Sequence, residues 1–150
     1  MQKEQTIDHV LRATWQTVAK MYNEQAVKYD STMSMAFVLL SIDIEKGTPS
    51  TALGPLMGME PTSLSRILKN MEERNFIYRE KNPNDGRGVL IKLTELGFEK
   101  RTTSREHVIL FNDTVKKHIS AEKIKHFFEV TETINNLINN KKIFDINPIK

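Results

Sequence analysis

The sequence predicts a mainly α-helical protein with a small β-hairpin wing, in which a winged helix-turn-helix lobe is joined to helical regions at both chain ends. Apolar residues recur at helical spacing along most of the chain. Two strand-like runs flank a turn-rich segment near residue 85, and two short helical segments that meet at a glycine precede these runs. With 150 residues, of which 39% are hydrophobic and 27% charged, the chain is expected to form one domain and not a membrane protein.

The first two helices are expected over residues 6–29 and 33–45. In the first, Ile7, Leu11 and Trp15 follow one another at four-residue spacing, so they share one face. The second is apolar nearly all round, which predicts that it is buried inside the domain.

Two further helices are expected to form the helix-turn-helix pair. The first covers residues 50–57 and ends at Gly58, although Pro55 removes one backbone donor within it. The second covers residues 61–74 and begins with Pro61, whose missing N–H is no loss in the first turn. Its buried side carries Leu64, Ile67, Leu68 and Met71.

The pattern then changes to strands at residues 77–81 and 89–93, which predicts a hairpin with a long loop. Thr94 is a good N-cap for a helix that runs to about residue 119, and Ser120 can cap a last helix. That last helix carries an apolar stripe of Ile124, Phe127, Phe128, Thr131, Ile134, Leu137 and Ile138.

The positive charge of the chain is concentrated in the second helix of the pair and the hairpin. Residues 61–93 contain seven basic and four acidic residues, an excess equal to the net charge of +3 for the whole chain. A basic patch on a helix-turn-helix and its wing favours a polyanionic partner, which here means double-stranded DNA.

The candidate DNA-binding residues lie at the start of the second helix and along the hairpin. Small hydroxyls let a helix approach a groove closely, and cations bind phosphates or guanine edges. Arg87 is expected to enter the minor groove, with Asp85 holding its guanidinium in a bidentate pair. A solvated helix start and an ordinary polar loop are the alternatives. The candidates are Thr62, Ser63, Ser65, Arg66, Lys69, Arg79, Lys81, Asp85 and Arg87.

Five short motifs at fixed spacing carry a resemblance to a known family. They are MGM at 57–59, PTSLSR at 61–66, MEERNFI at 71–77, DGR at 85–87 and LTELG at 93–97. Together they resemble the MarR-type regulators, the multiple-antibiotic-resistance repressor family. The resemblance implies a homodimeric transcription regulator, a ligand-responsive repressor that binds a near-palindromic operator. Two positions depart from the family, since Glu60 stands where members often carry Ser or Thr and Pro55 is unusual.

The resemblance and the apolar faces at the chain ends together predict the domain organisation. We expect a single MarR-like domain with a DNA-binding lobe over about 33–97 and dimerisation helices over about 1–29 and 100–150. Apolar faces at both chain ends exceed what a monomer easily covers, although an intramolecular core takes part of each. The dimerisation candidates are Ile7, Leu11, Ile124, Phe128, Ile134 and Ile138, with further apolar residues at Ile143, Phe144, Ile146 and Ile149.

A small-molecule effector is the remaining partner that the resemblance implies. Its candidate pocket residues are Trp15, Tyr22 and Met35, although aromatic residues at seven-residue spacing more often serve packing.

No residue pattern points to catalysis. The chain has no cysteine, its four histidines show no metal-ligand spacing, and its glycines form no phosphate loop. We therefore expect no metal, no cofactor, no enzymatic activity, no membrane partner and a cytoplasmic location. The alternative function is a ligand-binding or protein-interaction module that keeps this fold without binding DNA.

Overall fold

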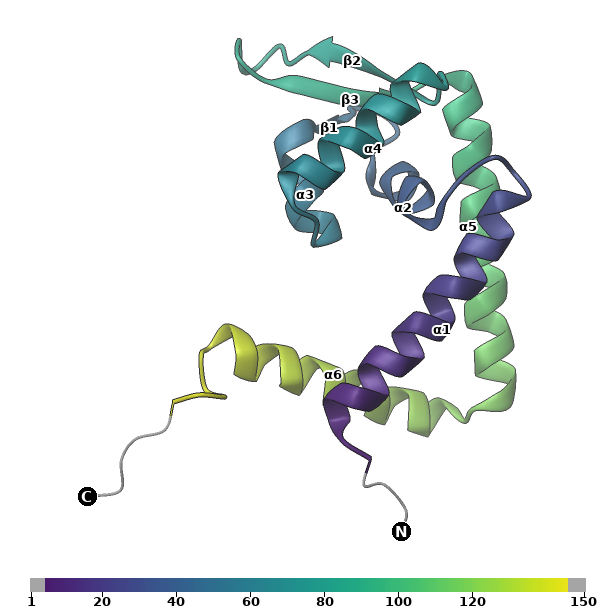
Figure 1. Cartoon of the computed structure of the whole chain (residues 1–150), viewed down its shortest axis with the longest axis vertical. Helices are drawn as coiled ribbons and strands as arrows, with labels where there is room; N and C mark the ends of the chain where they lie inside the picture. The colour runs from purple at the N-terminus through teal and green to yellow at the C-terminus, as the bar shows by residue number, and fades with distance from the viewer. Residues whose placement is uncertain (1–4, 146–150) are drawn as a thin grey trace. The chain divides into compact units, whose positions relative to one another are not determined.

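The computed structural model describes residues 5–145 and contains, within this range, six helices and three short strands (Figure 1). In chain order these are α1 (Ile7–Val27), α2 (Met33–Ser41), β1 (Thr48–Pro49), α3 (Ser50–Met57), α4 (Pro61–Glu73), β2 (Ile77–Lys81), β3 (Val89–Leu93), α5 (Glu95–His118) and α6 (Ala121–Asn139). The expected mainly helical class with a small hairpin is confirmed. The chain divides into two compact units, and the boundary lies within α5, between His107 and Val108. The apolar Ile146 and Ile149 lie outside the described residues.

The core of the first unit lies where α2, α3, α4 and the sheet meet. Val38, Leu39 and Leu53 are fully buried, as expected for the apolar segment that forms α2. The remaining members of the core cluster are Met35, Ile42, Leu64, Leu68, Met71, Phe76, Ile77 and Ile91. Because α4 contributes three of these side chains, its opposite face is left to solvent.

The second helix is shorter than the sequence predicts, because α2 ends at Ser41 and not near residue 45. The Asp43 carboxylate accepts the backbone N–H groups of Glu45 and Lys46, each at 2.9 Å. Such local side-chain bonds compete with helical ones and favour a turn. The same backbone hydrogen bonds, from Lys46 and then Glu45, hold the pKa of Asp43 below its ordinary value.

The turn after α2 leads into a strand that the sequence analysis missed. β1 pairs antiparallel with β3, with Thr48 opposite Ile91, so the sheet has the order β1-β3-β2. A strand of two residues is too short to show the alternating pattern by which strands are predicted. The register of the hairpin places Ile77 opposite Leu93 and Lys81 opposite Val89, which confirms both predicted strands.

Gly58 forms the turn between α3 and α4. It adopts the left-handed conformation with φ of 62°, and the next residue, Met59, donates its N–H to Gly54 O at 3.0 Å. This is the usual glycine C-cap of a helix. Glu60 makes no side-chain cap on α4, as expected from its departure from Ser or Thr, and Pro61 occupies the first turn.

Thr94 and Ser120 cap the last two helices, as predicted. The Thr94 hydroxyl oxygen accepts the N–H of Gly97 at 2.9 Å, and the Ser120 hydroxyl oxygen accepts the N–H of Lys123 at 3.3 Å. Gly97 is also required sterically, since a Cβ there would lie 1.8 Å from the carbonyl oxygen of Phe76. None of the helices in residues 5–145 is long and apolar enough to cross a membrane.

Candidate nucleic-acid interface

The exposed face of α4 carries the predicted helical candidates. Leu64, Leu68 and Met71 anchor the helix in the core, so the residues between them turn outwards. The structure places five candidate side chains on this solvent face: Thr62, Ser63, Ser65, Arg66 and Lys69. Arg66 and Lys69 are three residues apart and therefore lie on neighbouring turns of one side.

The β2–β3 hairpin ends in a loop that projects away from the helices (Figure 1). Asn82 and Gly88 close this loop, because Asn82 N–H donates to Gly88 O at 3.0 Å. Within it, Asp85 Oδ1 accepts the backbone N–H of Arg87 at 3.0 Å. The expected bidentate pair between Asp85 and the Arg87 guanidinium is absent from the ion pairs of residues 5–145. Asp85 fixes the backbone of the loop and leaves the Arg87 guanidinium free, because an Asx turn satisfies the nearby N–H group.

Three of the seven basic residues in this region have partners within the protein. Arg79 Nε pairs with Glu72 Oε2 at 3.0 Å, and Lys92 Nζ pairs with Glu80 Oε2 at 2.7 Å. The latter carboxylate raises the pKa of the Lys92 ammonium. Arg74 donates to the carbonyl of Asp30. The side chains of the other four are exposed and make no ion pair or hydrogen bond with the described residues; they belong to Arg66, Lys69, Lys81 and Arg87.

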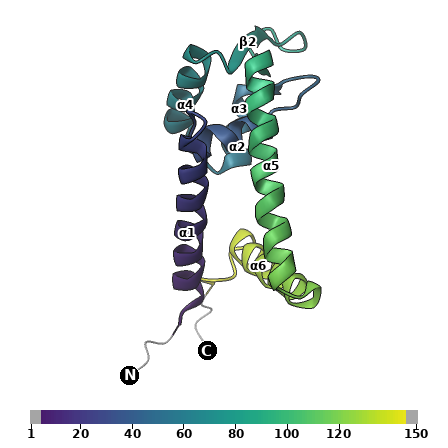
Figure 2. The same ribbon diagram turned by 90° about the vertical axis from the view of Figure 1, so that its right-hand side faces the viewer.

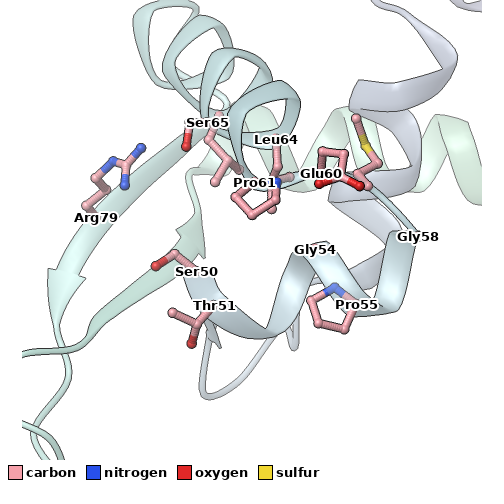
Figure 3. A pocket seen from close by; sticks show the side chains of 12 residues that line it. Ser50, Thr51, Gly54, Pro55, Gly58, Glu60, Pro61, Leu64, Ser65 and Arg79 are labelled. Atoms are coloured by element: carbon pink, nitrogen blue, oxygen red, sulfur yellow. The ribbon is translucent and has the colours of Figure 1, made fainter.

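An open groove of about 530 Å³ lies between α3 and α4. Figure 3 shows Ser50 and Thr51 from the start of α3 along one side, with Ser65 of α4 and Arg79 of β2 along the other. Leu64 lines the groove from α4 and gives it an apolar wall. Ser50 and Thr51 are not among the predicted DNA-binding residues, although adjacent hydroxyls at the start of a predicted helix are visible in the sequence.

The three predicted pocket residues separate into two places. Trp15 and Tyr22 of α1 both lie against Phe37 of α2, with ring centroids 6.4 and 6.0 Å apart. Burial raises the pKa of the Tyr22 hydroxyl. Met35 is instead 4% exposed and belongs to the core cluster. Phe37, which joins the two aromatic residues of α1, was not singled out because α2 is apolar nearly all round.

The predicted dimerisation residues are exposed to different extents. In the first unit, Ile7 is 67% exposed and Leu11 is 41% exposed. In the second unit, Phe128 and Ile138 are exposed, whereas Ile124 and Ile134 are half-buried. Further exposed apolar side chains in that unit are Ile109, Leu110, Ile119, Phe127, Val130, Leu137, Ile143 and Phe144. Over the described part of the chain, no three His, Cys, Asp or Glu side chains are grouped to hold a metal ion.

The part of the chain that forms α2, the helix-turn-helix pair and most of the hairpin is similar in sequence to known proteins. Residues 32–89 match the MarR family. The HTH-type transcriptional regulator SarZ of Staphylococcus haemolyticus is 28% identical over 94 residues, which cover 63% of this chain and 64% of SarZ. The chain therefore spans somewhat less than two thirds of this relative.

Solved structures share the fold over more of the chain. The MepR chain in the S. aureus MepR–DNA complex matches with a TM-score of 0.81 at 18% identity. The match covers 89% of this chain and 100% of the MepR chain. The PcaV transcriptional regulator from Streptomyces coelicolor, in complex with its natural ligand, has a TM-score of 0.75 at 18% identity. That match covers 91% of this chain and 98% of PcaV. These neighbours share the winged-helix fold of this chain.

Proposed function

We propose that this chain, which belongs to the MarR family through residues 32–89, is a transcription regulator that binds double-stranded DNA in a sequence-specific manner as a homodimer. One observation carries the proposal. The solvent face of α4 and the hairpin loop together present four cations without partners among the described residues, on a helix-turn-helix lobe. The MepR structure, which is similar in fold, is a complex with DNA.

In the proposed complex, α4 lies in the major groove and the hairpin loop lies over the minor groove. Ser63 and Ser65 on the solvent face of α4 can approach base edges and phosphates, with Arg66 and Lys69 beside them. Arg87 can enter the narrow, negative minor groove. Since Asp85 already fixes the loop backbone, less conformational freedom is lost when Arg87 binds.

The domain boundaries form part of this proposal. Residues 33–97 form the DNA-binding lobe, and residues 1–29 and 100–150 supply the dimerisation helices. The exposed apolar side chains of α1 and α6 support it, because large exposed apolar surface marks an interaction site.

The regulator is inferred to be a repressor that responds to a small-molecule effector, and not an enzyme. The proposed binding place of such a ligand is beside the aromatic cluster of Trp15, Tyr22 and Phe37. The PcaV structure of similar fold holds its natural ligand. A cytoplasmic location follows from this role.

Selection of DNA fragments by the purified protein, followed by gel shifts, tests the proposal. The protein is expected to enrich a near-palindromic sequence, and Arg66→Ala and Lys69→Ala are expected to weaken its binding. Lys117→Ala, which removes an exposed cation outside residues 33–97, is the matched control. Absence of any enriched sequence, with binding no tighter than to random duplex, would favour the alternative of a module that does not bind DNA.

The hairpin is tested separately by salt titration. Arg87→Ala is expected to weaken binding to most sequences and to reduce the salt slope by about one, as for one lost phosphate contact. Asp85→Ala is expected to weaken binding less, because it removes only the turn that presents Arg87. Wild-type affinity and slope in both variants would show that the hairpin is passive.

A further inference from the structure

Two cations from other elements hold the chain where α1 ends. Asp30 has a φ of 55°, and Ser31 N–H donates to Ala26 O at 3.0 Å, which closes the helix. The carbonyls of Tyr29 and Asp30 lie beyond the last residue of α1 and are open to side-chain donors. Lys100 Nζ of α5 donates to Tyr29 O at 2.7 Å, and Arg74 Nη1 donates to Asp30 O.

Both cations also contact residues at or just beyond the C-terminal end of α4. Arg74 directly follows the last residue of α4, and its Nε donates to Asn70 Oδ1 at 2.9 Å. Lys100 Nζ lies 5.7 Å from the ring centroid of Phe76, which is buried just beyond α4. Figure 1 shows the ends of α1 and α4 and the first turns of α5 on the same side of the lobe.

Physical chemistry favours these contacts at this place. Carbonyls at a helix C-terminus carry partial negative charge, which attracts cations. Hydrogen bonds from a charged donor are about twice as strong as neutral ones. The two bonds therefore join the segment that follows α1 to the C-terminal end of α4 and to α5. The helix α1 itself extends away from the lobe (Figure 2).

We propose that Arg74 and Lys100 are positioning residues, which fix the direction of α4 relative to α1 and α5 and so set the spacing between half-sites that the dimer accepts. This inference rests on the proposed function, in which α1 and the helices after residue 100 carry the dimer contacts. A dimer with rigidly held α4 helices accepts one separation of half-sites, because each added base pair rotates one site by about 35° on a duplex of 10–10.5 base pairs per turn.

The experiment measures binding to the selected operator and to duplexes with one base pair added or removed between its half-sites. Arg74→Ala and Lys100→Met are compared with wild type, and Arg105→Ala is the control. Arg105 is an exposed cation of α5 whose side chain makes no hydrogen bond or ion pair with residues 5–145. The fluorescence of Trp15, the one tryptophan of the chain, checks that α1 stays packed on Phe37.

The preference for the selected spacing is expected to fall about tenfold in each variant, equivalent to about 1.4 kcal/mol, while the salt slope and binding to random duplex stay unchanged. Arg74→Lys is expected to restore part of the preference, because it keeps one charged donor. A preference that is unchanged in both variants overturns the inference. The inference is also overturned if the salt slope falls by about one and affinity falls equally for all duplexes, since Arg74 would then be a phosphate contact. If wild type itself selects no sequence, the proposed function fails, and not this inference alone.

Discussion

The ion pair between Glu72 of α4 and Arg79 of β2 is predicted to weaken DNA binding, so Glu72→Gln is expected to bind operator more tightly. The two side chains are 45% and 39% exposed, and Arg79 lines the groove beside α4. In the native protein the carboxylate offsets the charge of a cation on the proposed interface. Glutamine keeps an acceptor for the Arg79 Nε–H but removes the negative charge.

The magnitude follows from the exposure of the pair. Exposed ion pairs contribute about 0.2–1 kcal/mol, so Glu72→Gln is expected to lower the free energy of unfolding by no more than this. On DNA, one more effective positive charge steepens the salt slope by about 0.9. The advantage of the variant over wild type is therefore expected to shrink about 3.5-fold between 50 and 200 mM salt.

Fluorescence anisotropy with labelled operator at several salt concentrations measures both quantities. Glu73→Gln is the matched control, because Glu73 is the next residue of α4, is exposed, and forms no ion pair among the described residues. In the double variant with Arg79→Gln the gain is expected to disappear. If Glu72→Gln binds no more tightly than Glu73→Gln, the pair does not restrain Arg79. If it binds more weakly, Glu72 orients Arg79 for DNA and the reasoning is wrong.

Three further predictions concern stability and assembly. Gly97→Ala is expected to destabilise the protein by about 3 kcal/mol, because a Cβ would lie 1.8 Å from a backbone oxygen. In thermal unfolding this lowers the Tm by roughly 6–12 °C, whereas Gly86→Ala, with nothing within 4 Å, is expected to change little. Replacing Ile134 and Ile138 together with Glu is expected to give monomers or insoluble protein in light scattering, and a soluble, unchanged dimer would contradict the proposed interface. Hydrogen bonds from the backbone of Lys46 and Glu45 lower the pKa of Asp43 in the folded protein below its ordinary value. Its stabilising effect is therefore present above the unfolded pKa and is lost as the pH falls through the folded pKa. Asp43→Asn is therefore expected to show a shallower loss of stability in acid titration, and an identical acid limb would count against this role.

The site was predictable to the extent that it depends on periodic burial. Leu64, Leu68 and Met71 repeat at helical spacing, so the solvent position of Arg66 and Lys69 followed from the sequence. The partners of the cations could not be predicted in this way. Glu72 and Arg79 are seven residues apart on different elements, and only the packing of β2 beside α4 brings them together.

The hairpin shows the same division within a shorter segment. Its strands and the dense turn formers between them indicated the loop, because glycine, proline, asparagine and aspartate favour turns for local reasons. Whether the Asp85 carboxylate bonds to the backbone or to the guanidinium of Arg87 depends on the dihedral angles of the loop. In the structure the Asp85 carboxylate accepts the backbone N–H of Arg87.

The sequence by itself determined the elements, their order, the caps at Thr94 and Ser120, and the basic character of α4 and the hairpin. These properties depend on residues within a few positions of one another, where propensity, hydrophobic period and capping act. Tertiary structure alone decided the two-residue strand β1, the ion pair of Glu72 with Arg79, and the binding of Arg74 to the carbonyl of Asp30. Each of these involves groups on separate segments of the chain. Whether such groups meet depends on how the helices and strands pack, and no local pattern records it.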